Sequence, residues 1–320
     1  AKVGGATQVG KGVYTHFLDE KGGIRADLTI VRLSEDCFRV ICGGGTGHRD
    51  LVWIKQMAAV RNADIEIHNR THQLATLGLW GPNARKVLAS LVDDPNAVSD
   101  AKFPFATAAN IEIAGINIWA FRISYVGELG WELYFDFADG LQLWDLFADA
   151  GVNPVGIETY ANSRRLEKSL RLQNADLETD YNLHEADLAR KLVKKADFHG
   201  KAAYVAQKAA DQQTSYLCTM VMLKNVDASG VARYPVGEWP ILNKETREVL
   251  LDEFGRRSIC TSVEYGPSLG SNIILGYIPA EFASVGTELL LEYFCEEYPI
   301  RIEAVGYAPL LDPENLRVRS

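Results

Sequence analysis

The chain has few of the features that mark a membrane or secreted protein. None of its apolar runs approaches the roughly 20 residues that a membrane helix needs. The first residues, AKVGGATQVGKG, contain no apolar stretch of a signal peptide. They also lack an initiator methionine, which is typical of a processed or trimmed chain. We therefore expect no membrane association.

Cysteine and histidine are scattered without the spacing of a metal site or a disulfide framework. The five cysteines are an odd number and none stands in a CxxC pair: Cys37, Cys42, Cys218, Cys260 and Cys295. The six histidines include no HExxH pattern. This usage predicts no metal and reduced thiols, and therefore a cytoplasmic protein, or one of the mitochondrial matrix if the source is eukaryotic.

Basic charge and nucleotide-binding signatures are also missing. The net charge of −9 argues against a nucleic-acid partner, because a phosphate backbone requires a basic face. The glycine-rich CGGGTG at residues 42–47 has neither the GK[ST] ending of a phosphate loop nor the GxGxxG spacing. No GxSxG elbow is present. We expect any flavin or nicotinamide chemistry to reside on another chain or domain.

The patterns that are present indicate a globular protein with an α+β body followed by a β-rich unit. Its 320 residues are 47% hydrophobic and 23% charged, enough for two or three cores. Helices are predicted at residues 47–60, 82–91, 140–150, 157–170 and 200–207. From residue 216 onward short apolar runs are separated by Gly and Pro, which predicts a small β-barrel or sandwich. Strands in the first unit are predicted at residues 12–18, 25–33, 38–42, 65–69, 76–80, 108–113, 116–124 and 131–135.

The segment RISYVGELGWELY, residues 122–134, is the most informative stretch of the chain. It is predicted to form two strands around a tight turn bracketed by Gly127 and Gly130. Tyr125, Glu128 and Glu132 lie within it. A carboxylate can accept two parallel hydrogen bonds from the N–H edge of a flat heterocycle. The alternative is a plain hairpin with exposed acids.

The chain resembles the tetrahydrofolate-binding aminomethyltransferases of the glycine-cleavage T-protein family. It is most similar to the folate half of dimethylglycine and sarcosine dehydrogenases or oxidases. The resemblance rests on motifs in the family's order: VYTHFLDEKGGIRADLTIVRL, GHRDLVWI, LGLWGPNARKVL, RISYVGELGWELY, RRLEKSLRLQNADL, KKADFHGKAA, SLGSNIILGYIPAEFASVGTELLLEY and LLDPENLRVR. It implies an α+β fold, a ferredoxin-like folate-binding body over residues 1–207 followed by a small C-terminal β-barrel over residues 215–320.

The resemblance assigns roles to six residues. It places the family's catalytic aspartate at Asp27, where a carboxylate beside a glycine turn could orient or deprotonate an amine. The alternative for Asp27 is a solvated aspartate of a turn at the entry of its strand. The cofactor-binding positions implied by the resemblance are Tyr14, Tyr125, Glu132, Arg165 and Gln173.

Three of these positions have a structural alternative or depart from the family pattern. Tyr14 could be an ordinary core aromatic, and Arg165 could form a helix-surface ion pair with Glu167 or Glu158. The family has an aromatic residue and a glycine where this chain has Gln173 and Asn174. Lys168 and Arg171 are expected near the glutamate tail of the folate. Gly43 and Glu185 also stand in motifs that differ from the family's.

The family also has several dozen residues before VYTHFL, and the chain does not show them. Because they normally supply strands and part of the pocket wall, we expect an exposed sheet edge and a tight association with a partner.

The function implied is tetrahydrofolate-dependent one-carbon transfer, with 5,10-methylenetetrahydrofolate as the product. A methylated amine would be oxidised to an iminium at a flavin site on a partner chain or another domain, so FAD is not expected here. Two alternatives remain open. One is a folate-dependent methyltransferase that demethylates an O-, S- or N-methyl group directly, and the other is a non-catalytic scaffold or regulatory subunit. An oligomer is possible.

Overall fold

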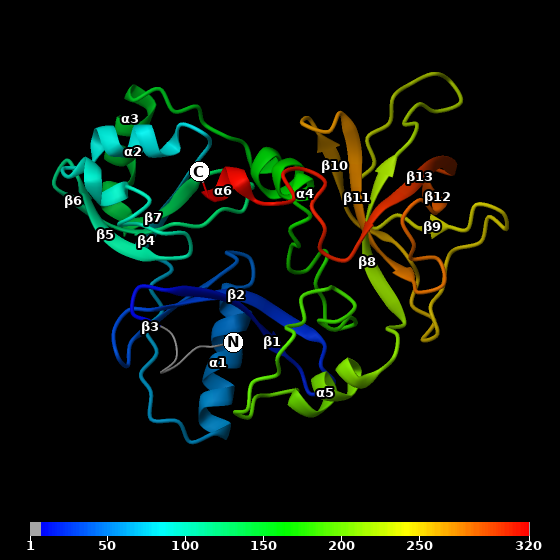
Figure 1. Cartoon of the computed structure of the whole chain (residues 1–320), viewed down its shortest axis with the longest axis horizontal. Helices are drawn as coiled ribbons and strands as arrows, with labels where there is room; N and C mark the ends of the chain where they lie inside the picture. The colour runs from blue at the N-terminus through cyan, green and yellow to red at the C-terminus, as the bar shows by residue number, and fades with distance from the viewer. Residues whose placement is uncertain (1–7, 320) are drawn as a thin grey trace.

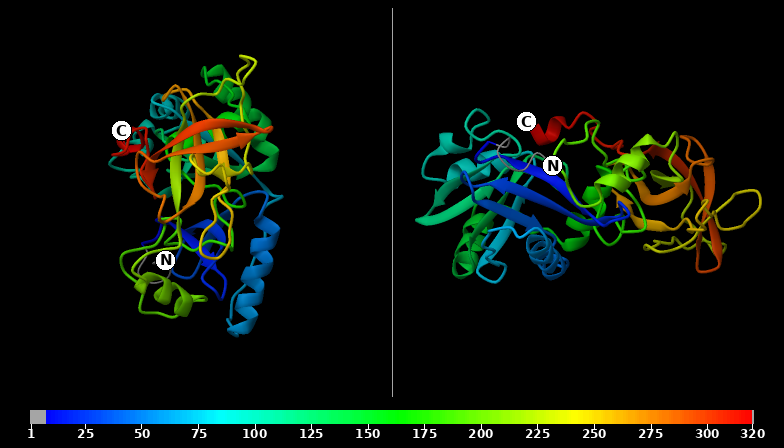
Figure 2. Two further views of the ribbon diagram at one scale, coloured as in Figure 1. Left: turned by 90° about the vertical axis from the view of Figure 1, so that its right-hand side faces the viewer. Right: turned by 90° about the horizontal axis from the view of Figure 1, so that it is seen from below.

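Three antiparallel sheets form three lobes around a central irregular segment (Figure 1). The computed structural model describes residues 8–319. The sheets have the strand orders β1-β2-β3, β4-β7-β6-β5 and β10-β11-β8-β13-β12-β9. The segregation of helices from antiparallel strands is the α+β arrangement that the sequence predicts. The C-terminal lobe stands at one end of the molecule (Figure 2).

The first lobe is a three-stranded meander with one long helix beside it. Apolar residues alternate along the strands, and Asp19 closes the first turn by accepting hydrogen bonds from the backbone N–H groups of Lys21 and Gly23. β1 and β3 are the edges of this sheet, and Phe38 and Val40 on β3 are exposed. Its elements are β1 (Gly12–Leu18), β2 (Ile24–Arg32), β3 (Phe38–Cys42) and α1 (Gly47–Val60).

The second lobe buries one face of a four-stranded sheet against two helices. Trp131 and Leu133 on β7 are fully buried in its core, together with Leu88 and Leu143 from the helices. Because strand side chains alternate, Glu132 and Tyr134 lie on the opposite face. The elements are β4 (Leu74–Trp80), α2 (Ala84–Leu91), η1 (Pro95–Val98), β5 (Ala108–Ile113), β6 (Ile116–Phe121), β7 (Gly130–Asp136), η2 (Phe137–Asp139) and α3 (Gly140–Asp149).

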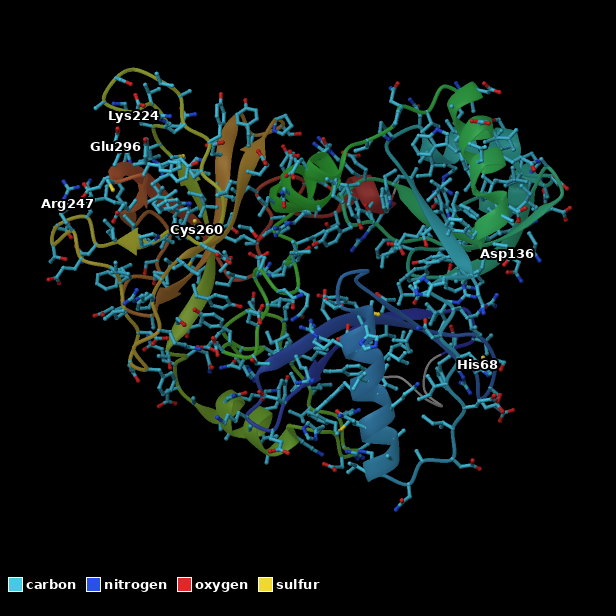
Figure 3. The ribbon with its side chains drawn as sticks, turned by 180° about the vertical axis from the view of Figure 1, so that it is seen from behind. His68, Asp136, Lys224, Arg247, Cys260 and Glu296 are labelled. Atoms are coloured by element: carbon cyan, nitrogen blue, oxygen red, sulfur yellow. The ribbon has the colours of Figure 1, made fainter. Side chains whose placement is uncertain are left out.

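The third lobe is a β-barrel that the last strands nearly close. A bridge between Pro240 and Ile259 joins the β9 edge to the β10 edge. Cys260 is buried inside, whereas Lys224, Arg247 and Glu296 lie on the outer loops and hairpin ends (Figure 3). The strands are β8 (Ser215–Met222), β9 (Ile241–Leu242), β10 (Cys260–Gly266), β11 (Ser271–Pro279), β12 (Glu288–Tyr293) and β13 (Glu296–Val305).

A segment of little regular structure connects the lobes. It begins with a π-helix, η3 (Glu158–Arg164), continues into the single turn α4 (Arg165–Glu167), and reaches the barrel through α5 (Lys201–Ala209). The chain ends in α6 (Leu316–Arg319), which lies between the second lobe and α4 (Figure 1).

Several predicted elements differ from the structure. Residues 65–69 form no strand and are mostly exposed, because no neighbouring strand pairs with them. The helix predicted at residues 157–170 is replaced by η3 and α4, and Ser169 after it has a φ of 54°. The turn of the hairpin is a longer loop, since β6 ends at Phe121 and β7 begins at Gly130. No helix in residues 8–319 is long and apolar enough to cross a membrane.

Candidate functional site

Asp27 and Tyr14 form a hydrogen-bonded pair on adjacent strands. The β1–β2 register pairs Asp27 with His16, so Tyr14 lies one diagonal position away on the same face. The Tyr14 hydroxyl donates to Asp27 Oδ2 at 3.0 Å. The prediction that Asp27 lies at a strand entry is wrong, because β2 begins three residues earlier, at Ile24. A central strand position holds the carboxylate more rigidly than a turn would.

The environment of Asp27 favours its neutral form more than water does. Burial raises the pKa of the Asp27 carboxyl, and the hydrogen bond from Tyr14 opposes that rise. Asp50, buried in the first turn of α1, raises this pKa further, whereas Arg49 lowers it. A carboxyl with a raised pKa is suited to accept and return a proton.

Tyr125 lies in the loop between β6 and β7 and reaches the central segment. Its hydroxyl donates to the backbone carbonyl of Arg171 at 2.9 Å. Burial is the main cause that raises the pKa of Tyr125, and the nearby carboxylate of Asp27 contributes to the rise. Tyr125 also contributes to the raised pKa of Tyr14. The structure therefore brings Asp27, Tyr14 and Tyr125 into one neighbourhood.

Glu132 lies on β7, on the face that points away from the core of the second lobe. It accepts a short hydrogen bond of 2.5 Å from the Tyr134 hydroxyl. Burial raises the pKa of the Glu132 carboxyl, and the bond from Tyr134 opposes the rise. Arg39, on β3 of the first lobe, lies 4.0 Å over the Trp119 ring, beside Tyr134. The first and second sheets thus face each other across the site.

Two aromatic residues that the sequence reading missed connect Tyr125 to Glu132. Tyr160, on the π-helix, stacks on Trp80 with ring centroids 5.3 Å apart and lies 5.5 Å from the Tyr125 ring. Burial, with the nearby Glu132 carboxylate, raises the pKa of Tyr160 to about 12. This contact could not be predicted from a local sequence pattern, because Trp80 and Tyr160 come from distant segments of the chain. π-helical turns are frequent at functional sites.

Both glycines of the predicted turn are needed where the loop passes close to other segments. Gly127 has a φ of +73°, and a Cβ there would lie 2.2 Å from Lys168 Cγ. A Cβ on Gly130 would lie 2.0 Å from the carbonyl oxygen of Leu79. The loop that carries Tyr125 is therefore fixed between β4 and the central segment.

Gln173 lies in the central segment with an unpaired acceptor. Its Nε2 donates to the Leu177 carbonyl at 2.8 Å, while its buried Oε1 has no partner among the described residues. Arg49 on α1 donates to Asn174 Oδ1 at 2.8 Å, and its buried Nη2 is likewise unpaired within residues 8–319. Buried polar atoms of this kind are normally satisfied by a ligand or water. The charge of Arg49 lowers the pKa of Asp27, so Arg49 acts on the same site.

Arg165 does not offer its guanidinium to a ligand. It is 1% exposed, and it donates to Asp176 at 2.5 Å, to Ser262 Oγ at 2.6 Å and to the Ala161 carbonyl at 2.7 Å. The alternative, a helix-surface ion pair with Glu167 or Glu158, is also absent from its described contacts, and Glu167 pairs instead with Arg164. Arg165 therefore joins the central segment to the barrel.

Lys168 and Arg171 are likewise unavailable to a folate tail. Lys168 is 2% exposed and donates to the Asp312 carbonyl at 2.6 Å, while Arg171 is 4% exposed and donates to the Ala186 carbonyl at 3.1 Å. Both side chains hold the segment that supports Tyr125. Glu185 is buried and forms an ion pair with Arg256.

The end of the chain supports the same loop. Glu128 Oε1 accepts hydrogen bonds from Arg164 at 2.8 Å and from Arg317 at 2.9 Å. Arg122 donates to the Arg319 carbonyl at 3.3 Å. Glu128 is thus a structural residue. Glu132, in the same hairpin, has a second carboxylate oxygen that accepts no hydrogen bond from the described residues.

The residues of this site fit a folate. A partly buried carboxylate, Glu132, matches the paired N–H donors of a pterin, and the rings of Tyr125 and Tyr160 provide flat walls. The unpaired Gln173 Oε1 and Arg49 Nη2 offer one further acceptor and one further donor. No group of three or more metal-binding side chains occurs in residues 8–319.

Comparison with known proteins identifies the family. Residues 4–196 match the family model of the GCVT N-terminal domain, and residues 237–305 match the glycine cleavage T-protein C-terminal barrel domain. The first of these matches covers more than half of the chain, so the protein belongs to the glycine cleavage T-protein family. The predicted fold, an α+β body followed by a small C-terminal barrel, is confirmed.

Individual relatives agree with this assignment. The chain is 34% identical over 291 residues to the mitochondrial dimethylglycine dehydrogenase of Homo sapiens, covering 89% of this chain and 31% of that protein. It is 30% identical over 285 residues to the aminomethyltransferase of Listeria welshimeri, covering 88% of this chain and 72% of that protein. The chain thus spans about a third of the length of the dimethylglycine dehydrogenases it matches.

A solved structure shares the fold. The crystal structure of glycine cleavage system aminomethyltransferase T from Bartonella henselae superimposes with a TM-score of 0.77 at 22% sequence identity. The match covers 96% of this chain and 77% of that one.

Proposed function

We propose that this protein binds tetrahydrofolate between its first two lobes and transfers a one-carbon unit to it. The observation that supports the proposal is the chain of neighbours that links Asp27, Tyr125 and Glu132: the Asp27 charge raises the pKa of Tyr125, the Tyr125 ring lies 5.5 Å from Tyr160, and the Glu132 charge raises the pKa of Tyr160. The relatives named aminomethyltransferase support the reaction class. Tetrahydrofolate would supply the nucleophilic amine that accepts the carbon unit.

The chain's own residues would bind the pterin, orient it and move one proton. Glu132 would hold the N–H edge of the pterin, with Tyr134 fixing the orientation of the carboxylate. Tyr125 would pack on the ring, and its position is fixed by the bond to the Arg171 carbonyl. Asp27 would accept or steer a proton, with Tyr14 stabilising its charged form. Enclosure by the two lobes would keep water from a reactive carbon unit.

The carbon unit would come from a methylated amine oxidised elsewhere. The relatives named dimethylglycine dehydrogenase support a flavin-containing partner chain or domain that produces the iminium. In this proposal the present chain is the folate module, and 5,10-methylenetetrahydrofolate is the product. We also propose, as domain limits, residues 1–207 for the folate-binding part and 215–320 for the barrel.

A direct folate-dependent methyltransferase is the second candidate. The unpaired Gln173 Oε1 and Arg49 Nη2 favour it, because they could hold polar groups of a substrate that enters without prior oxidation. The scaffold alternative requires that the site has lost its function. The partly buried carboxylates of Asp27 and Glu132, whose pKa values burial raises, weigh against it, since retaining them without a ligand costs stability.

The Asp27→Asn variant tests the proposal. The protein's acceleration of transfer from formaldehyde to tetrahydrofolate over the spontaneous condensation should be lost, whereas calorimetric binding of tetrahydrofolate should be retained, because Asn keeps the size and removes the proton acceptor. Glu112→Asn, an exposed substitution on β5, is the control. Full activity of Asp27→Asn would show that Asp27 has no role in the reaction.

A further inference from the structure

The acidic side chain of a folate has no obvious cation among the residues expected to meet it. Tetrahydrofolate consists of a pterin, an aminobenzoyl group and a glutamate that carries two carboxylates. Lys168 donates to the Asp312 carbonyl at 2.6 Å, and Arg171 donates to the Ala186 carbonyl at 3.1 Å. Both cations are therefore occupied within the chain. Any recognition of the folate carboxylates has to come from another cation of the site.

The order of side chains along the site gives the direction in which this tail leaves. Burial and the Glu132 charge raise the pKa of Tyr160, whose ring lies 5.5 Å from that of Tyr125. Burial and the Asp27 charge raise the pKa of Tyr125. In tetrahydrofolate the N–H edge of the pterin and the tail lie at opposite ends, with the reacting amines between them. With the N–H edge at Glu132 and the amines at Asp27, the tail continues beyond Asp27.

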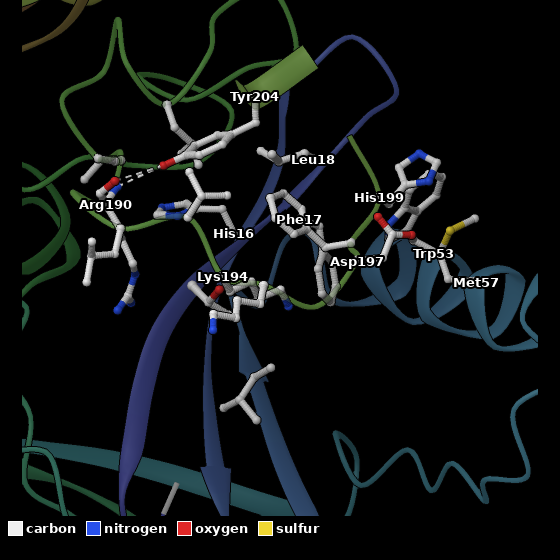
Figure 4. A pocket seen from close by; sticks show the side chains of 18 of the residues that line it. His16, Phe17, Leu18, Trp53, Met57, Arg190, Lys194, Asp197, His199 and Tyr204 are labelled. Atoms are coloured by element: carbon white, nitrogen blue, oxygen red, sulfur yellow. Dashed lines mark hydrogen bonds between the residues drawn. The ribbon is translucent and has the colours of Figure 1, made fainter. Parts of the chain in front are cut away.

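Helix α1 brings Arg49 to this far side of Asp27. Arg49 and Trp53 are four positions apart and share one face of the helix. The guanidinium of Arg25 lies 4.1 Å over the Trp53 ring, and His199 contacts that ring edge-on (Figure 4). Arg25 and Asp27, two positions apart on β2, share one face of the strand. The helix face that carries Arg49 is thus held toward the strand face that carries Asp27.

Arg49 keeps one N–H group free in a fixed guanidinium. Nη1 donates to Asn174 Oδ1 at 2.8 Å and Nε to Asp50 Oδ1 at 3.3 Å, whereas Nη2 is buried without a partner in residues 8–319. Asp50 also accepts from Thr46 Oγ1 at 2.7 Å, so its charge is shared. Burial raises the pKa of Glu178 and the Arg49 charge opposes that rise, yet the two form no ion pair in the described part of the chain. A planar cation with a free N–H suits a carboxylate.

The loop before α1 leaves open space on the same side. Cys42 on β3 pairs with Leu28, so the chain enters this loop next to Asp27. A Cβ on Gly44 or on Gly45 would meet no atom within 4 Å, and neither glycine has a positive φ. The fold itself therefore does not require glycine at these two positions. Their small size keeps free a space through which a ligand can approach the backbone closely.

Arg39 also has an unpaired N–H group within the described residues, but it lies at the other end of the site. Its guanidinium is 4.0 Å over the Trp119 ring and 5.9 Å from the centre of the Tyr134 ring. Tyr134 in turn donates to Glu132. Arg39 is therefore close to the proposed N–H edge of the pterin, where the tail does not leave.

We propose that Arg49 binds the glutamate tail of the folate, with Nη2 donating to one of its carboxylates. Gln173, next to Asn174, has an unpaired Oε1 that would accept from the amide N–H of the same tail. This inference rests on the proposed function and adds selection of an acidic folate over an uncharged pterin. The tail then lies beside the loop at residues 43–46.

A pair of ligands that differ only in charge tests the proposal. The first is tetrahydrofolate, and the second is its diamide, in which both carboxylates are replaced by amides. Arg49→Gln removes the cation and keeps a side-chain amide near Asn174. Anaerobic calorimetry with the whole chain should show that this variant binds tetrahydrofolate about tenfold more weakly than the natural protein does, as expected for one charged hydrogen bond. Its affinity for the diamide should stay unchanged.

Matched variants separate this role from a general loss of charge or fold. Lys55→Gln, on an exposed position of the same helix, should leave both affinities unchanged. Arg49→Lys should recover part of the loss for tetrahydrofolate, because it restores the charge without the planar fork. Equal weakening of both ligands by Arg49→Gln would overturn the proposal and place its effect on the pterin or on the fold.

Two further outcomes would also overturn the proposal. Unchanged affinity of Arg49→Gln for tetrahydrofolate, together with weaker binding of sarcosine, would assign the guanidinium to the carboxylate of the amine substrate. Failure of the natural protein to bind either folate ligand would contradict the proposed function itself, and this inference with it. The first outcome leaves the folate site intact, so the two failures are distinguishable.

Discussion

The Tyr14 hydroxyl lies 3.0 Å from Oδ2 of Asp27, across neighbouring strands of the first sheet. This bond connects an exposed aromatic residue to the proposed proton acceptor. Burial alone would favour the neutral carboxyl, and Tyr14 shifts the balance toward the carboxylate. The reactivity of Asp27 therefore depends on its neighbour as well as on its position.

Replacing Tyr14 should change the pH dependence of transfer. In Tyr14→Phe the bond that lowers the pKa of Asp27 is lost, so this pKa rises further and the carboxylate forms at higher pH. The acidic limb of the pH–rate profile should move up by about one unit, the size expected for one hydrogen bond to a charged group. The loss is greatest at low pH and is recovered at high pH. A uniform loss at every pH would show that Tyr14 acts only on folate binding.

The Asp27→Asn variant should be more stable than the natural protein at neutral pH. A carboxyl whose pKa is raised in the folded state destabilises the protein as pH rises from its unfolded value through its folded value. Asparagine cannot ionise and avoids this loss. Urea denaturation should therefore show a gain at pH 7 that disappears near pH 3. A gain of equal size at both pH values would mean that ionisation is not its cause.

Glu132 and Glu128 lie four positions apart but should respond differently to the same change. Glu132→Gln removes the carboxylate proposed to hold the pterin and should weaken tetrahydrofolate binding by about 10- to 100-fold, corresponding to about 1.5–3 kcal/mol for charged hydrogen bonds. Glu128→Gln removes the negative charge from the contacts with Arg164 and Arg317 and so weakens them. It should lower thermal stability and leave the affinity nearly unchanged. If Glu128→Gln weakened folate binding and Glu132→Gln only lowered thermal stability, Glu128 would be the ligand-binding residue and Glu132 the structural one.

Arg165 should prove to be a structural residue. Arg165→Ala leaves Asp176 buried without its cation and should lower the free energy of unfolding by about 3–5 kcal/mol. In Arg165→Met/Asp176→Leu no charge is stranded, so part of this loss should be recovered. Chemical denaturation measures both variants. If Arg165→Ala kept its stability but lost folate affinity, the guanidinium would contact the ligand after all.

Much of the local structure could be predicted from residue patterns. β1, β3 and α1 have the predicted limits because their apolar residues follow a strict strand or helix period. The strand period also gave one wrong prediction. Residues 65–69 alternate like a strand, yet no neighbour pairs with them, and pairing is a non-local property.

The site was predictable where its residues lie in one motif. Glu132 and Tyr134 are two positions apart in a strand, so their shared face could have been read from WELY. The contact between Trp80 and Tyr160 could not, because these residues are 80 positions apart and meet only through the π-helix. The structural role of Arg165 could not be predicted for the same reason, because its partners Asp176 and Ser262 come from other segments of the chain.

The most direct test of the folate site is calorimetric titration of the purified chain with tetrahydrofolate, alone and with any flavoprotein that co-purifies with it. We predict saturable one-to-one binding by the chain alone that is weakened by Glu132→Gln and retained in Asp27→Asn. Binding only in the presence of the flavoprotein would mean that a partner completes the site. No binding under either condition would contradict the account and leave the scaffold alternative.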